Sequence, residues 1–237
     1  MSSDVSEPSP RPVVSLRQVA YDSIRQRVLD GSYAPGSLLS ENQIGDELGI
    51  SRTPVREALR DLVGAGLVRI LPQRGIIVSD LTAADIIEVY QVREELECLA
   101  VALATPRLTA RKKARLQTDH RRAVAALGAG RLRQAYDHAV LMHARIIEAA
   151  GNARLSRFMD QLADEAHRYG LITLRAGHAE HAIRDHGTII AALVQGDGAR
   201  AAALMRQHLR ADRDLALRSA LPCDAAPAPR AAARRGA

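Results

Sequence analysis

The chain has 237 residues, of which 47% are hydrophobic and only 3% aromatic. This length allows two modest hydrophobic cores, and the scarcity of aromatic residues favours helix packing over a sheet sandwich. No apolar run is long enough for a membrane span, the N-terminus does not resemble a signal peptide, and the two cysteines, Cys98 and Cys223, are far apart. We therefore expect a soluble cytoplasmic protein with no structural disulfide and no membrane partner.

The charge of the chain suits a polyanionic partner without proving one. The formal net charge is +6 and the sequence pI is about 9.9. Residues 1–80, however, contain nine arginines and ten acidic residues, so the excess of positive charge lies elsewhere. An argument for nucleic-acid binding by the N-terminal part must therefore depend on the placement of its arginines.

The N-terminal part of the chain reads as a small helical domain preceded by an arm. Residues 1–14 are rich in Ser and Pro, which predicts a disordered arm. Apolar residues at helical spacing then predict helices over 16–30, 40–49 and 53–64. Only about three residues separate the second helix from the third, which is typical of a helix-turn-helix.

Local signals define the ends of these elements. Ser40 and Gln43 form a capping-box pair at the start of the second helix. Thr53 is the expected N-cap of the third, because Pro54 suits the first helical position. The β-prone runs Leu67–Ile70 and Ile76–Val78 predict a hairpin with a basic tip. Residues 15–80 are therefore predicted to form a winged helix-turn-helix.

The third helix predicts contact with DNA. Its apolar residues lie on one face, while Arg52, Arg56 and Arg60 recur every four residues on another. A recognition helix places its first residues against base edges in the major groove, and arginine can grip guanine bidentately. A plain solvated face remains the alternative for an isolated helix. The candidate DNA-binding residues are Asn42, Ser51, Arg52, Thr53, Arg56, and Arg74 with Gly75 at the hairpin tip.

After Asp80 the sequence changes to long helical patterns separated by glycine-containing breaks. Helices are expected over 82–105, 109–127, 131–150, 152–175, 179–195 and 198–218. We predict a mostly α protein in which a winged helix-turn-helix of three helices plus a β-hairpin precedes an antiparallel bundle of six to seven helices, residues 81–219. Residues 220–237, rich in Ala, Pro and Arg, predict a disordered basic tail.

Three histidines of the predicted bundle share one pattern. His143, His186 and His208 each have apolar neighbours at helical spacing, so each lies on or beside the buried stripe of its own helix. Three inward imidazoles could converge on a divalent metal of the Zn or Ni type. The alternative is that each is a core histidine satisfied by a backbone carbonyl. The patterns around His120, His167, His178 and His181 differ, and these four are expected at the surface.

These features together resemble a known family. The run ISRTPVREALRDLVGAGLV followed by RGIIV resembles the winged-helix half of the GntR family of bacterial transcription regulators. The helical half resembles the FadR-type branch, whose C-terminal FCD domain binds an effector and dimerises. The resemblance spans about residues 15–215. It places DNA contacts on Arg52, Thr53, Arg56, Arg74 and Gly75, and a basic or polar contact at Asn42.

The resemblance also bears on the histidines. The segments HARIIEAAGN, DHGTIIAALVQGD and ALMRQHL match the places where metal-binding FCD domains carry ligand histidines, here His143, His186 and His208. A fourth ligand in those domains, an Asp one helical turn before the first histidine, corresponds to Ala139. Water or an effector carboxylate would then complete the shell. A metal-free effector pocket lined by the same histidines is the competing interpretation.

An arginine in the helical half is a further effector candidate. Arg93, in VYQVREELE, matches a family arginine that points into the effector cavity, where a guanidinium would bind a carboxylate bidentately. The alternative is an ordinary surface pair with Glu97, four residues on. The effector-binding residues implied are thus Arg93, His143, His186 and His208.

The resulting hypothesis is a ligand-responsive transcription regulator that acts as a repressor and is not an enzyme. It would bind a pseudo-palindromic double-stranded DNA operator as a homodimer, under control of a small carboxylate effector, with a divalent metal as the candidate cofactor. A metal-dependent enzyme is one alternative, but no general base or nucleophile stands beside the histidines. An architectural DNA-binding protein without an effector is the other, and it would not need inward polar groups.

Overall fold

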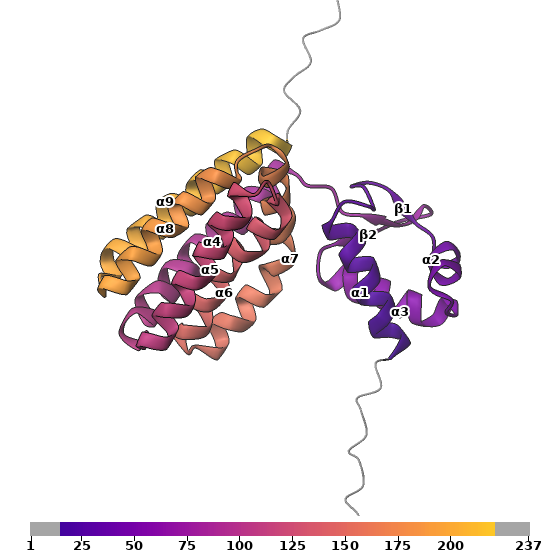
Figure 1. Ribbon diagram of the computed structural model, residues 1–237. Coiled ribbons are helices and arrows are strands. Elements are labelled where there is room, and N and C mark those ends of the chain that lie inside the picture. The colour runs from indigo at the N-terminus through magenta and orange to yellow at the C-terminus, as the bar shows by residue number, and fades with distance from the viewer. Residues whose placement is uncertain (1–14, 221–237) are drawn as a thin grey trace, which may run out of the picture. The chain divides into compact units, whose positions relative to one another are not determined.

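The computed structural model describes residues 15–220, and these residues are mostly α-helical. The chain divides into two compact units, with the boundary between Asp80 and Leu81 (Figure 1). The predicted arm at 1–14, the tail from residue 221 onward and Cys223 lie outside the described residues. None of the helices within 15–220 combines the length and the apolar character that crossing a bilayer requires.

The first unit has the predicted winged helix-turn-helix architecture. Its helices are α1 (Leu16–Leu29), α2 (Glu41–Leu48) and α3 (Arg52–Gly64), and its strands are β1 (Leu38–Leu39), β2 (Val68–Leu71) and β3 (Gly75–Val78). The strands form an antiparallel sheet in the order β1-β3-β2, so a short strand that the sequence did not predict extends the hairpin. Helix α1 packs against α3 over a core that includes Ile24, Leu59 and Leu62.

The turn between α2 and α3 is closed by glycine. Gly49 caps α2 at φ 65°, in the left-handed region, and the Ile50 amide donates to the Gly45 carbonyl at 3.0 Å. A Cβ at Gly45 would lie 2.9 Å from the Ile50 oxygen, so this position needs glycine for close approach. The predicted start of the third helix was wrong by two residues. Ser51 is the N-cap instead of Thr53, because the tight turn sets the boundary and Pro54 is tolerated anywhere in the first turn.

The hairpin tip is a tight turn of unusual composition. The Arg74 amide donates to the Leu71 carbonyl at 3.1 Å, with Pro72 and Gln73 between them. Gln73 has φ 63° and is the sole non-glycine residue with positive φ between residues 15 and 220. A β-turn with Pro in its second position and positive φ in its third is of type II, which usually takes Gly or Asn there. The turn leaves Arg74 exposed at the tip of the wing.

The second unit is a bundle of six α-helices and one short 3-10 turn. The elements are α4 (Ala83–Ala104), η1 (Thr105–Arg107), α5 (Ala110–Gly128), α6 (Leu132–Ala150), α7 (Ala153–Arg175), α8 (Ala179–Gln195) and α9 (Gly198–Ala220). Helix α4 packs against α6, α7 and α9, while α8 packs against α5, α6 and α9. The mostly α fold class predicted from the sequence is therefore confirmed.

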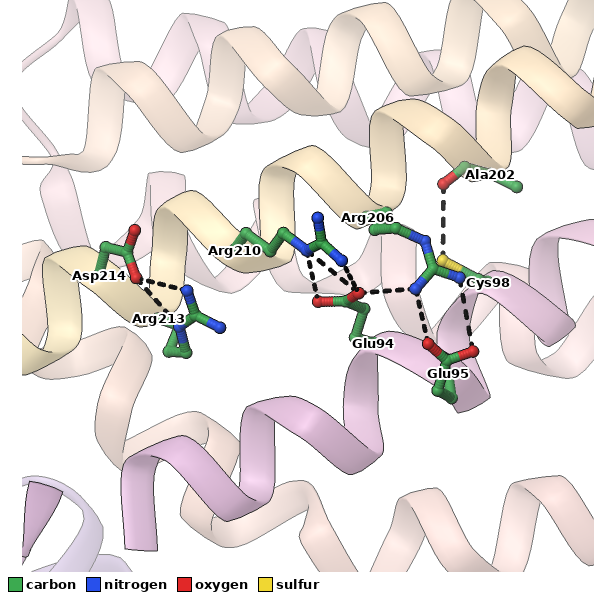
Figure 2. A network of polar contacts seen from close by, with 8 residues as sticks. All are labelled: Glu94, Glu95, Cys98, Ala202, Arg206, Arg210, Arg213 and Asp214. Atoms are coloured by element: carbon green, nitrogen blue, oxygen red, sulfur yellow. Dashed lines mark hydrogen bonds and ion pairs between the residues drawn. The ribbon is translucent and has the colours of Figure 1, made fainter. Parts of the chain in front are cut away.

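Ion pairs join the first and last helices of the bundle along one side. Glu94 of α4 accepts from Arg210 at 2.8 Å and from Arg206 at 2.6 Å, and Arg206 also reaches Glu95 (Figure 2). These arginines lower the pKa of the Glu94 carboxyl. Cys98 lies one turn further along α4, buried, with its sulfur 3.5 Å from the Ala202 carbonyl oxygen. These ion pairs therefore tie α4 to α9 through charged side chains.

Candidate functional site

The seven residues proposed to contact DNA are all exposed. They lie on α2, at the start of α3 and at the wing tip: Asn42, Ser51, Arg52, Thr53, Arg56, Arg74 and Gly75. Ser51 caps α3 by its backbone conformation alone, because its hydroxyl makes no capping hydrogen bond. Val55 and Leu59, on the opposite side of the same helix, are fully buried. Helix α3 is thus held from behind and leaves its first turn open.

A carboxylate that the sequence reading overlooked holds the arginines of α3. Arg56 donates from Nε and Nη2 to Glu41 of α2, with the Nη2 contact at 2.7 Å, and Arg52 Nη2 lies 3.7 Å from the same carboxylate. The hydrogen bond from Arg56 lowers the pKa of Glu41. The signal was available as a single acid at the start of α2, but only the packing of α2 on α3 brings it to Arg56.

In the helical unit, three histidines from three helices meet. His143 of α6, His186 of α8 and His208 of α9 form what we call the histidine cluster. The Nε2 atoms of His143 and His186 are 3.2 Å apart, and those of His186 and His208 are 3.1 Å apart. His186 and His208 are buried, and the His143 side chain is only 14% exposed. Three metal-binding nitrogens therefore face one another inside the bundle.

This arrangement does not satisfy the imidazoles by themselves. A neutral imidazole nitrogen offers one hydrogen or one lone pair, so the Nε2 atom of His186 cannot make full hydrogen bonds to both neighbours. The Nδ1 atoms of His186 and His208 are buried with no hydrogen-bond partner in the described chain. None of the three rings is bonded to a described backbone carbonyl, the arrangement that the core-histidine alternative required. Buried polar groups left in this way call for an explanation.

A divalent metal bound between the three rings would explain why their Nε2 atoms face one another. Two nitrogens bound to one tetrahedral zinc ion at about 2.0–2.1 Å lie roughly 3.3 Å apart, close to the separations observed here. Burial, together with the neighbouring rings of His208 and His143, lowers the pKa of His186 well below its ordinary value. A neutral imidazole is the form that binds metal. The donor set therefore fits a metal ion of the Zn or Ni type.

Glu97 connects the cluster to Arg93. Its Oε2 atom pairs with His143 Nδ1, and its Oε1 atom accepts from Arg93 Nε at 3.0 Å. Burial alone would raise the pKa of Glu97, but His143 and Arg93 together lower it to about 2. A carboxylate on Nδ1 orients an imidazole so that its Nε2 lone pair is free for a metal. The pair of Arg93 with Glu97 thus exists, but it is buried instead of lying at the surface.

Arg93 retains donor capacity within this buried setting. Its guanidinium carbon lies 5.0 Å from the centre of the Tyr90 ring, and its Nη1 makes no hydrogen bond to a described residue. The Glu97 carboxylate and the Tyr90 hydroxyl keep the pKa of Arg93 raised despite its burial. The structure therefore brings Arg93 and the histidine cluster together through one carboxylate.

Comparison with known proteins identifies both units. Residues 16–78 match the model of the bacterial regulatory proteins of the gntR family, and residues 88–211, more than half of the chain, match the FCD domain. The chain belongs to the GntR family. It is a GntR-family transcriptional regulator whose helical unit is an FCD effector-binding domain, and the matched families and relatives are regulators of transcription and not enzymes.

Individual relatives of this GntR-family regulator agree. The HTH-type transcriptional repressor GlaR of Escherichia coli is 27% identical over 201 residues, covering 80% of this chain and 90% of GlaR. The uncharacterized HTH-type regulator YdhC of Bacillus subtilis is 27% identical over 177 residues, covering 71% and 76%. The solved structure of E. coli McbR/YncC superposes with a TM-score of 0.74 at 25% identity, covering 87% of this chain and 99% of that one.

The FCD domain departs from the expected metal site at Ala139. This residue lines a small cavity beside His186 together with His120 and His138. The expectation that His120 lies at the surface was wrong, because the packing of α5 on α8 half-buries it and lowers its pKa. Gly187 makes room for that ring: a Cβ there would lie 2.9 Å from His120 Nε2.

Of the remaining histidines expected at the surface, only His181 is exposed. His167 is half-buried against Tyr136, whose hydroxyl lies 3.3 Å from His167 Nδ1, and His178 is half-buried at the start of α8. Two acids near the cluster were also missed. Asp185 Oδ2 lies 3.5 Å from His208 Nδ1, and Asp212 Oδ2 lies 3.6 Å from His208 Nε2. Asp185 directly precedes His186 and Asp212 lies one turn after His208, which was the available signal.

Proposed function

We propose that this regulator is a repressor that binds a pseudo-palindromic operator as a homodimer and releases it in response to a small organic acid. GlaR, a transcriptional repressor by name, supports the direction of the response by similarity. Two copies of a helix-turn-helix match two half-sites that are one helical turn apart, which is why a homodimer and a palindrome go together.

The first turn of α3 reads the bases in this proposal. Arg52, Thr53 and Arg56 are exposed there, and Glu41 orients the Arg56 guanidinium. Asn42 and Ser51 contact the backbone or base edges beside them, while Arg74 and Gly75 of the wing reach the minor groove or flanking phosphates. Glycine at the second wing position lets the backbone approach the DNA closely.

The effector and a divalent metal share the buried polar site of the FCD domain. The observation that supports this part is the convergence of three histidine Nε2 atoms, of which that of His186 lies within 3.2 Å of both others. His143, His186 and His208 would hold the metal, which when bound supplies a Lewis-acidic centre for a carboxylate oxygen. Arg93 would take the other part of the acid through the donors that Glu97 leaves free.

Glu97 gives a physical link between the two binding events. The Glu97 carboxylate contacts both Arg93 and His143. An acid that binds the Arg93 guanidinium therefore changes the surroundings of the carboxylate that orients His143. Control of DNA binding then requires that the acid bind one arrangement of the dimer more tightly than the other.

The DNA part is tested with an operator obtained by in vitro selection from random DNA. Loss of a bidentate arginine–guanine contact removes about 1–3 kcal/mol of discrimination, so Arg52→Ala and Arg56→Ala should each weaken operator binding by roughly 5- to 150-fold. Arg111→Ala, which removes an exposed arginine of α5, is the matched control and should change nothing. Unchanged affinity and base preference in both α3 variants would reject the recognition-helix assignment.

The effector part is tested by a thermal-shift screen of small carboxylic acids with and without Zn²⁺ or Ni²⁺. A ligand present at about 100 times its Kd should stabilise the folded state by about 2.7 kcal/mol. An acid found in this way should also release operator DNA, and Arg93→Met should abolish both effects. An acid that stabilises the protein but leaves DNA affinity unchanged would favour an architectural role.

A further inference from the structure

We propose that Asp212 of α9 is the fourth protein ligand of the metal centre, in place of the carboxylate missing at Ala139. This inference rests on the metal centre proposed above and names a residue that the family pattern does not provide. The donor set would again be three imidazoles and one carboxylate, but the carboxylate would come from the last helix of the bundle instead of α6.

The position of Asp212 is the first argument. It follows His208 by four residues, so the two side chains lie on the same face of α9. Its Oδ2 atom is 3.6 Å from His208 Nε2, and that nitrogen is itself 3.1 Å from His186 Nε2. Ligands of one tetrahedral zinc ion lie roughly 3.3 Å apart. The Asp212 oxygen is near that distance from His208, but the donor atoms that lie within 4.8 Å of one another are those of the three histidines alone, so the Asp212 side chain must turn toward the cluster to bind the same ion.

The side of the ring that Asp212 faces is the second argument. Three carboxylates contact the histidine cluster within the described chain, and two of them lie on Nδ1 atoms: Glu97 on His143 and Asp185 on His208. Those two occupy the positions of groups that orient metal ligands. Asp212 alone faces an Nε2 atom, the nitrogen that points into the centre of the cluster.

The third argument is that Asp212 makes no hydrogen bond within the described chain, although its negative charge acts on the neighbouring Arg93 and His208. Its side chain is only 16% exposed, yet neither oxygen makes a hydrogen bond to a described residue. A half-buried carboxylate without a hydrogen bond is unfavourable unless a cation satisfies it. By contrast, Asp137, the acid nearest to Ala139 in the sequence, is 52% exposed and bonded to Arg133 at 2.9 Å.

Charge balance favours the same assignment. Three neutral imidazoles leave the full charge of a divalent cation inside the bundle, where an uncompensated charge is costly. Asp212 supplies one negative charge at the nitrogen face, and Glu97 and Asp185 supply further charge behind the rings. Carboxylate and imidazole together are a common ligand set for Zn and similar metals.

The experiment measures metal affinity of the full-length, tag-free chain. Zn²⁺ and Ni²⁺ are titrated against a chromophoric chelator, for the wild type, Asp212→Asn and Asp137→Asn. We expect Asp212→Asn to weaken binding by at least about tenfold, because even groups behind the ligands contribute 10- to 100-fold. Asp137→Asn, which removes an exposed acid of α6, should bind as the wild type does.

A rescue separates ligation from a purely structural role. Ala139 lines a small cavity beside His186, so the double variant Asp212→Asn with Ala139→Asp places a carboxylate at the family position. This double variant should regain most of the lost affinity, and its Co²⁺ absorption spectrum should return toward that of the wild type. Circular dichroism of the metal-free variants checks that each one is folded.

The outcomes are distinguishable. Metal affinity unchanged in Asp212→Asn but lost in His143→Ala would overturn the role of Asp212 and leave the metal centre in place. Loss of stability in metal-free Asp212→Asn without loss of metal affinity would likewise overturn it, and would make Asp212 an ion-pair partner of His208. A wild-type chain that binds neither metal would overturn the metal centre and this inference together.

Discussion

The two polar sites of this regulator have opposite surroundings, although both are organised by one carboxylate between two basic groups. In the winged helix, Glu41 holds Arg56 and lies near Arg52, and both arginines are about half exposed or more, at 47% and 61%. In the FCD domain, Glu97 holds Arg93 and His143, and its side chain is only 1% exposed. Water screens the first set and is excluded from the second.

This difference in burial determines how much each site contributes to the stability of the ligand-free protein. Exposed ion pairs contribute about 0–1 kcal/mol, so the arginines of α3 can exchange Glu41 for phosphate or bases at small cost. The buried set is held only by its internal partners, and the Nε2 atom of His186 faces two other Nε2 atoms without being able to bond fully to both. The proposed DNA site therefore contributes little to stability, whereas the proposed metal site contains histidine nitrogens that the described chain alone does not satisfy.

The largest expected effect comes from breaking the buried carboxylate. Glu97→Gln keeps the shape of the side chain but leaves the Arg93 charge uncompensated, and removing one partner of a buried pair costs about 3–5 kcal/mol. The free energy of unfolding, from urea denaturation, should fall by that amount. Metal affinity should also fall by about 10- to 100-fold, because His143 loses the group that orients it.

Glu95→Gln is the matched control for that measurement. Glu95 lies on the same helix and pairs with Arg206, but its side chain is 71% exposed. Its replacement should leave both the free energy of unfolding and metal binding unchanged within error. If Glu97→Gln and Glu95→Gln proved equally mild, the contrast between the buried and the exposed site would be wrong.

The sequence predicted more of the exposed site than of the buried one, because periodicity within a helix can be read from sequence and packing between helices cannot. The exposed arginines could be read from spacing along one helix, because the face of a helix follows from its own periodicity. The histidine cluster was found because each ring has apolar neighbours on its own helix. Glu97 was expected only as a surface partner of Arg93, and Asp212 was not considered. An acid four residues from a basic residue usually lies at the surface, and the burial of both acids results from packing between distant helices.

Packing also decided where α3 begins and whether the His120 side chain is buried. The N-cap of α3 is Ser51 and not Thr53, the residue that Pro54 suggested, because the left-handed conformation of Gly49 ends α2 and lets the next helix begin two residues earlier. His120 was expected outside, yet Gly187 on a neighbouring helix makes space for it beside His186. Neither effect has a signal within the segment concerned.

The exposed carboxylate gives the counterpart prediction. Glu41→Gln should lower the free energy of unfolding by less than about 1 kcal/mol. Because Arg56 lowers the pKa of Glu41, the pair stabilises the fold above the ordinary pKa of the carboxyl, and this contribution is lost as the pH falls through the lowered folded value. The variant should lack that part of the acid dependence.

The same variant should have a clear effect on DNA. Removing a negative charge beside Arg52 and Arg56 strengthens the attraction to phosphates, so affinity for non-operator DNA should rise several-fold at low salt. Discrimination should decrease, since Arg56 loses the partner that orients it. Binding isotherms on operator and scrambled DNA across a salt series measure both effects. Unchanged discrimination would mean that Glu41 does not position Arg56 for base contact.

The smallest effect is expected at the wing, where the strain is local and exposed. Gln73 has φ 63°, a conformation that costs a residue with a Cβ about 1–2 kcal/mol, whereas glycine adopts it freely. Gln73→Gly should raise the free energy of unfolding by about 0.5–1 kcal/mol, since part of the gain is offset by the greater freedom of glycine in the unfolded chain. Gln73→Ala keeps the Cβ and should show no gain. If Gln73→Gly and Gln73→Ala were equally stable, the turn would not be strained at residue 73, and Pro72 and Gly75 alone would determine the conformation of the wing tip.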